Sequence, residues 1–93
     1  MKEDLLKIVE HFGINNQQRK LNEEVFELQE AITIVQQGNN QSNKEITEEM
    51  ADVMLLIEQF KLYYGIRIVE ITNIFWYKVA RTLQRIESGY YDK

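Results

Sequence analysis

The chain has 93 residues and a formal net charge of −4, with 44% hydrophobic and 28% charged residues and with neither proline nor cysteine. A chain of this length is expected to form one domain over residues 1–93, with a core so small that a partner chain would help to stabilise it. The lack of proline and the presence of only four glycines favour a packed all-α protein over a β-rich or disordered one.

The charge and the residue usage also exclude several classes of partner. An acidic chain lacks the broad basic surface of duplex-binding proteins, so duplex nucleic acid is not expected as a ligand. Without cysteine there is neither a disulfide nor a thiolate zinc site, which fits a reducing cytoplasm. No apolar run approaches the roughly 20 residues that span a bilayer, and the start Met-Lys-Glu-Asp is unlike a signal peptide. We therefore expect a cytoplasmic protein with no membrane partner.

Each of the four glycines follows a segment with helical periodicity, where a left-handed residue ends a helix at least steric cost. They predict four helices, over about residues 2–11, 15–37, 43–64 and 67–88. Asn15 with Gln18, and Ser42 with Glu45, have the spacing of capping boxes for the second and third helices. The short polar loop between these two long helices predicts that they pack antiparallel at the centre of a four-helix, bundle-like domain.

The second helix places acidic residues beside its core-facing stripe. The apolar stripe follows the i, i+4, i+7 spacing of a buried helix face and consists of Leu21, Val25, Leu28, Ile32 and Val35. Glu24 lies at the edge of this stripe, and Glu27 lies about 60° beyond it on the same side. The two carboxylates can therefore converge on one point.

The third helix carries acids in a similar arrangement but within a wider apolar face. Its stripe, widened by Leu56 and Tyr63, predicts burial on more than one side and consists of Ile46, Met50, Val53, Ile57, Phe60 and Tyr64. Glu49 falls inside the widened stripe, and Asp52 lies about 60° beyond it. A buried carboxylate without a partner costs several kcal/mol, so a cation or a proton must compensate Glu49.

The fourth helix concentrates positive charge beside an apolar face. The face expected to be buried consists of Ile68, Ile71, Phe75, Val79, Thr82 and Ile86. Lys78, Arg81 and Arg85, spaced i, i+3, i+7, lie on a neighbouring face. These cations could bind an anion such as a phosphate, form a solvated stripe, or pair with acidic helices of a partner subunit.

Together, the two acidic helices predict a metal site. The four carboxylates of Glu24, Glu27, Glu49 and Asp52 would offer the oxygen ligands that Mg²⁺ prefers, and Mn²⁺ is possible as well. Such ions neutralise charge on phosphoryl oxygens and activate water, while the three cations of the fourth helix would hold the rest of a polyphosphate. The sequence has no Ser-His-Asp, Cys-His or P-loop pattern. His11, the single histidine, lies near a helix end and fits a surface or capping role.

The order Glu-Glu-x-x-Glu at residues 23–27, a gap of about two dozen residues, and Glu-x-x-Asp at residues 49–52 resembles the MazG-like and dimeric dUTPase-like all-α nucleoside triphosphate pyrophosphohydrolases. The resemblance covers residues 17–85. It implies a dimer or tetramer, magnesium dependence, and hydrolysis of a (deoxy)nucleoside triphosphate to the monophosphate and pyrophosphate, as in housecleaning of the nucleotide pool. It also implies that Glu24, Glu27, Glu49 and Asp52 are the catalytic metal ligands, whereas Glu23 and Glu48 match the motif without being obvious ligands.

The chain departs from the pattern of the best-known MazG proteins in its last helix. Residues 78–85 read Lys-Val-Ala-Arg-Thr-Leu-Gln-Arg in place of a Lys-Asn and Arg-rich segment, which leaves the preferred nucleotide open. Lys20, four residues before Glu24, could form a structural i, i+4 ion pair with it. Two other functions stay open: a non-catalytic helical dimerisation or interaction module, and a nucleotide-binding regulator with little turnover.

Overall fold

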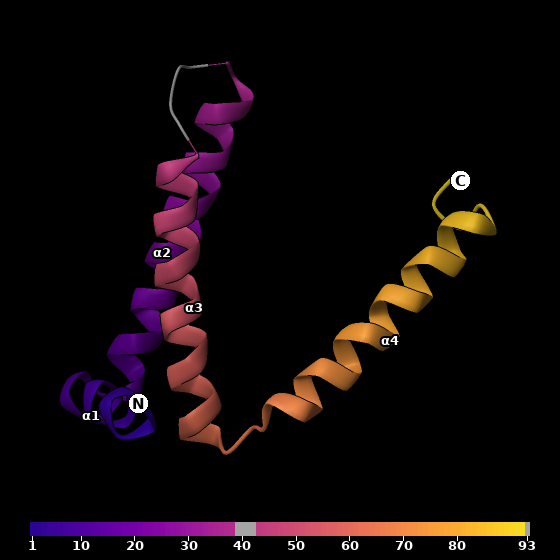
Figure 1. Cartoon of the computed structure of the whole chain (residues 1–93). Coiled ribbons are helices and arrows are strands. Elements are labelled where there is room, and N and C mark those ends of the chain that lie inside the picture. The colour runs from indigo at the N-terminus through magenta and orange to yellow at the C-terminus, as the bar shows by residue number, and fades with distance from the viewer. Residues whose placement is uncertain (39–42, 93) are drawn as a thin grey trace.

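The computed structural model describes residues 1–38 and 43–92, and within them it contains four helices and no strand. The helices are α1 (Lys2–Phe12), α2 (Ile14–Gln36), α3 (Lys44–Tyr64) and α4 (Ile68–Glu87). All predicted bounds lie within one residue of these, so the all-α class and the two long central antiparallel helices are confirmed (Figure 1). No described helix is both long and apolar enough to cross a membrane.

The start of α2 differs from the prediction. Gly13 is the N-cap, with φ 85°, and no side chain caps the helix, so the predicted capping box of Asn15 and Gln18 is wrong. Gly13 alone separates α1 from α2, so α2 begins two residues too early for Asn15 to act as its cap. The second predicted capping residue, Ser42, lies outside the described residues.

Helix α3 ends at a left-handed glycine, as the sequence predicted. Gly65 has the left-handed conformation, with φ 67° and ψ 29°. The backbone N–H of Ile66 donates to the carbonyl of Lys61 at 2.8 Å, and that of Gly65 donates to the carbonyl of Leu62 at 3.3 Å. Two of the carbonyls that a helix end leaves unpaired are thus satisfied, and glycine adopts this backbone without a steric penalty.

The three helices α1, α2 and α3 pack against one another, with α2 and α3 forming an antiparallel hairpin and α1 lying against both (Figure 1). Only three apolar residues are buried among the described residues, namely Val9, Ala31 and Leu56. The buried polar residues are Gln17, Glu24 and Gln59. The buried centre of the three packed helices therefore has as many polar as apolar residues.

The buried face of α3 lies to one side of the predicted stripe. Leu56 and Gln59 are buried, whereas Met50, Ile57 and Tyr64 of that stripe are exposed. The sequence predicted burial on more than one side of α3, but the buried positions lie along the edge of the stripe that carries Glu49 and Leu56. Residues 1–38 and 43–92 leave the remaining apolar side of α3 exposed.

Helix α4 stands apart from the other three helices in Figure 1 and contains no buried residue. The radius of gyration over Cα atoms is 16.9 Å, against about 12 Å for a compact chain of this length. The prediction that Ile68, Phe75 and Ile86 are buried is therefore wrong for a single copy, since all three are exposed. The connection after Gly65 directs α4 away from the hairpin.

Candidate metal centre

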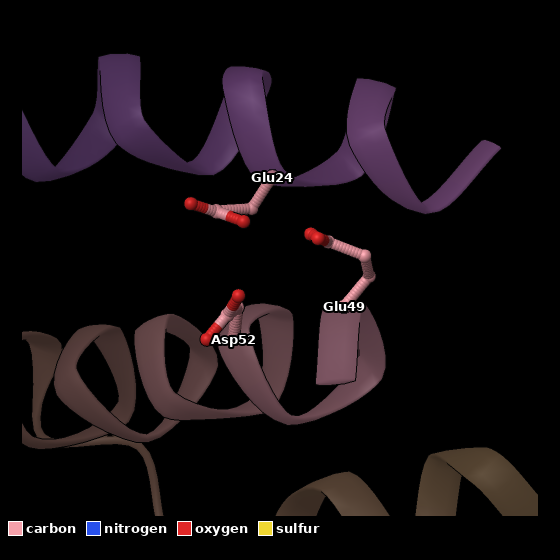
Figure 2. A group of neighbouring side chains, drawn as sticks. All are labelled: Glu24, Glu49 and Asp52. Atoms are coloured by element: carbon pink, nitrogen blue, oxygen red, sulfur yellow. The ribbon is translucent and has the colours of Figure 1, made fainter. Parts of the chain in front are cut away.

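Three of the predicted carboxylates meet where α2 and α3 face each other. Each of Glu24, Glu49 and Asp52 offers one oxygen, and these oxygens lie within 4.8 Å of one another. Figure 2 shows Glu24 projecting from α2 towards Glu49 and Asp52, which project from α3. Glu49 and Asp52 are three residues apart, so one helical turn brings both to the same side of α3.

Glu24 is the most buried of the three, with 5% of its surface exposed, while Glu49 is partly buried and Asp52 is exposed. This order reverses the prediction, which placed Glu24 at the edge of a stripe and Glu49 inside one. Glu24 is more buried than predicted because it belongs to the row of residues on α2 that faces α3. Gln17, Glu24 and Ala31 are spaced by seven residues, which is close to two helical turns, and all three are buried.

The Glu24 carboxylate is only half satisfied. Its Oε1 lies 3.0 Å from the Nζ of Lys20, so the predicted i, i+4 ion pair is confirmed. Its Oε2 is buried and has no hydrogen-bond partner, and the same holds for the Oε2 of Glu49. Buried acceptors in this state are rare because losing water without a replacement is unfavourable. The two oxygens are therefore suited to bind a cation, or to share a proton when no cation is bound.

The electrostatics of the cluster show the same need for positive charge. Loss of water, the adjoining Glu24 carboxylate and the negative charges of Glu27 and Asp52 raise the pKa of Glu49 to about 7. The hydrogen bond from Lys20 lowers the pKa of Glu24 despite its burial. Near neutral pH, and without a bound cation, Glu49 therefore retains a proton on a substantial fraction of molecules.

Glu27 lies outside the group of three. Its side chain is exposed and lines a shallow hollow of about 220 Å³ together with Glu30, Glu45 and Glu49. It still adds to the negative potential at Glu49, whose pKa it helps to raise. The structure thus brings together three of the four predicted ligands and places the fourth at the outer edge of the site.

The three predicted substrate-binding cations lie on α4, away from the carboxylates of the same chain. No ion pair joins Lys78, Arg81 or Arg85 to a carboxylate within residues 1–38 and 43–92. The Arg81 guanidinium lies 5.7 Å from the centre of the Tyr77 ring, and that of Arg85 lies 4.6 Å from the centre of the Tyr90 ring. Within one copy, these cations cannot neutralise the acidic site.

A cavity of about 440 Å³ opens beside the carboxylates, between α1, α2 and α3. Its apolar wall consists of Ile8, Phe12, Leu55 and Leu56, and its carboxylate end consists of Lys20, Glu24 and Asp52. Gln17 and Gln59 also line it, and the Nε2 of Gln17 donates to the Oε1 of Gln59 at 2.7 Å. The sequence interpretation missed this amide pair, although the spacing of seven residues places Gln17 in line with Glu24.

Comparisons with protein-family models, with curated proteins and with solved structures found no match to this chain. The resemblance to the MazG-like enzymes thus stays a prediction from the two acidic motifs. A functional proposal has to come from the carboxylate group and the cavity beside it.

Proposed function

We propose that this chain is a magnesium-dependent nucleoside triphosphate pyrophosphohydrolase that converts a (deoxy)nucleoside triphosphate into the monophosphate and pyrophosphate in the cytoplasm, as part of nucleotide-pool housecleaning. The observation that carries this proposal is the buried Oε2 of Glu24, which has no partner and faces Glu49 and Asp52. Lys20 compensates the Oε1 of this carboxylate, but no group in the described part of the chain pairs with its Oε2, and a bound cation would do so.

The donor set fits a hard divalent ion. Glu24, Glu49 and Asp52 would hold Mg²⁺, or Mn²⁺, because both ions prefer carboxylate oxygens. The two buried oxygens without partners on Glu24 and Glu49 would find one in such an ion. When bound, the ion would neutralise charge on a phosphoryl oxygen and lower the pKa of a water, so that the water could lose a proton and act as the nucleophile towards phosphorus. Glu27, at the outer edge, would add to the negative potential that attracts the ion.

The cavity supports a nucleotide as the substrate. Its volume of about 440 Å³ lies within the usual range for small-molecule sites. The apolar wall that includes Phe12 and Leu55 would receive the base and sugar, and the carboxylate end would receive the phosphates. Lys20 is half exposed at that end, so its ammonium group could turn from Glu24 towards a phosphate oxygen.

In this proposal Lys78, Arg81 and Arg85 bind the outer phosphates. Since α4 leaves its own hairpin, the cations would have to reach the site from another copy, which supports a homo-oligomer, either a dimer or a tetramer. Charge-assisted contacts from arginine to phosphate would then hold the triphosphate in place.

The test is a screen for pyrophosphate release from common and damaged nucleoside triphosphates in the presence of Mg²⁺. We expect Glu49→Gln and Asp52→Asn to lower turnover by more than about 100-fold, since even outer-shell partners of a metal contribute about 10–100-fold. Glu48→Gln removes the neighbouring exposed acid and should retain turnover. Circular dichroism would check that all variants stay helical, and retained turnover in both site variants would refute the metal assignment.

A second candidate is a non-catalytic helical interaction module or a nucleotide-binding regulator, which the uncovered apolar face of α4 favours. Ligand binding to the folded state alone raises the melting temperature. A Mg²⁺-dependent rise that Glu49→Gln removes would support the metal centre, and its absence would favour the interaction module. A regulator would show the rise without pyrophosphate release.

A further inference from the structure

We propose that α4 is an arm exchanged between two copies of this chain, in which each α4 packs along the uncovered apolar side of α3 in the other copy. The observations behind this proposal are the connection between α3 and α4, two matching apolar faces, the excess surface and the charge distribution. None of them depends on the proposed enzymatic activity.

The connection between α3 and α4 is short and is held at both ends. The N–H of Ile66 donates to the carbonyl of Lys61, and the N–H of Arg67 donates to the Oε2 of Glu70, each at 2.8 Å. The first bond closes the end of α3 and the second closes the start of α4. Both helix ends are thus capped, and α4 runs away from its own hairpin (Figure 1), which leaves its apolar face open to another molecule.

The face that α4 presents is apolar along its full length. Phe75 and Ile68 are spaced by seven residues, as are Ile86 and Val79, and the two pairs lie on one side of the helix. Three of these residues are exposed, and Val79 is only partly covered. A helix of this length with one uncovered apolar stripe normally lies against a partner.

A matching face exists on α3. Met50, Ile57 and Tyr64 are spaced by seven residues, so they form a single line along the helix, and all three are exposed. The helices α3 and α4 have 21 and 20 residues, so each is about 30 Å long. Two apolar lines of similar spacing on helices of nearly equal length can interdigitate.

The surface area is that of a chain with a missing partner. The chain exposes 7664 Å², whereas a compact monomer of 11.1 kDa exposes about 5,700 Å². The excess of about 2,000 Å² per copy exceeds the roughly 800 Å² that each partner buries in a standard interface and lies in the range of obligate pairs.

Charge decides which faces pair. Helices α2 and α3 together carry four basic and nine acidic residues, a net charge of −5, whereas α4 carries three basic and two acidic residues, a net charge of +1. Contact between two hairpins would bring like charges together, and so would contact between two α4 helices. Packing of α4 on the hairpin of the other copy joins opposite charges, so the exchanged pair is the favoured arrangement.

Sedimentation equilibrium on matched variants tests the proposed surface. Ile57 and Leu55 are 45% and 44% exposed in the single chain, but they point to opposite sides of α3. We expect a dimeric wild type whose dissociation constant rises at least about tenfold, the contribution of one hot-spot residue, in Ile57→Lys and not in Leu55→Lys. On α4, Phe75→Lys should have the same effect and Tyr77→Lys, on the opposite side, should not.

Cross-linking tests the exchange without disturbing the interface charge. The chain has no cysteine, so Ile57→Cys and Phe75→Cys each carry a single thiol. After the two variants are unfolded and refolded together, a short bis-maleimide should join them into a covalent dimer, and neither variant alone should give a comparable yield. The proposal would be overturned by a wild type that stays monomeric at the highest soluble concentration. It would also be overturned by a dimer that neither Ile57→Lys nor Phe75→Lys weakens, or by cross-linking that occurs only within single-variant samples.

Discussion

The α2–α3 hairpin and helix α4 distribute their side chains in opposite ways. In the hairpin, the most buried positions include the polar residues Gln17, Glu24 and Gln59, whereas α4 exposes apolar residues such as Phe75 along its length. Both regions are amphipathic helices of similar size. The difference shows that burial within a single copy follows the geometry of the carboxylate group, while much of the apolar surface stays available for association.

This distribution has an energetic consequence. Three buried apolar residues provide little hydrophobic stabilisation for a domain of this size. Lys20 compensates one oxygen of the buried Glu24 carboxylate, but the second oxygen has no partner, which opposes folding. A single copy should therefore be only marginally stable, and cation binding or contact with a second copy should stabilise it further.

The largest expected difference between the two regions is the change in the free energy of unfolding when one leucine in each is replaced by alanine. Leu56→Ala, in the buried centre of the hairpin, should lower the free energy of unfolding by about 2–5 kcal/mol. Leu83→Ala, on exposed α4, should change it by less than about 0.5 kcal/mol in dilute solution. Urea unfolding at low and high protein concentration measures both.

At high protein concentration, Leu83→Ala should lower the free energy of unfolding further, because the copies then associate through α4. If the two leucines behaved alike in dilute solution, α4 would have to pack on its own hairpin, and the contrast between the regions would be wrong.

The amide pair in the hairpin gives the next largest effect. Gln17→Ala removes the donor to the Oε1 of Gln59 and leaves that buried oxygen without a partner, so the free energy of unfolding should fall by about 1–3 kcal/mol. Replacing both residues with leucine removes both polar groups and should be nearly neutral. If the double replacement destabilised the chain as much as Gln17→Ala alone, the two glutamines would contribute more to stability than the hydrogen bond that they make with each other.

The smallest expected effect is the pH dependence of the metal-free chain. The folded state raises the pKa of Glu49 from its ordinary value of 4.5 to about 7, so between these values the folded chain binds more protons than the unfolded chain. The free energy of unfolding should therefore fall as the pH rises through this window. Glu24 has a lowered pKa, so its contribution is lost only when the pH falls below 4.5 towards that lowered value.

Urea unfolding in the presence of a chelator, at several pH values, measures this trend. Glu49→Gln cannot ionise and should lack the decline between pH 4.5 and about 7. If the free energy of unfolding changed equally with pH in the wild type and in this variant, the neighbours of Glu49 would not raise its pKa in the folded chain. Added Mg²⁺ should offset the decline, because the ion binds the deprotonated carboxylates.

The sequence by itself determined the local structure. Helical periodicity and the glycines predict all four helices to within one residue, because the spacing of apolar residues and the left-handed glycine conformation are properties of short segments. The ion pair of Lys20 with Glu24 was predictable for the same reason, since four residues span one turn. The two acidic motifs also indicated which helices carry the candidate site.

Only the tertiary structure decided which side of each helix is buried. Periodicity orders residues around one helix axis, but the angle that faces a neighbouring helix depends on how both helices pack. That angle buries Glu24 more deeply than Glu49, leaves Glu27 at the edge of the site, and pairs Gln17 with Gln59 across 42 residues of sequence. The position of α4 likewise depends on the hydrogen-bonded connection after Gly65, which directs an apolar helix away from its own hairpin.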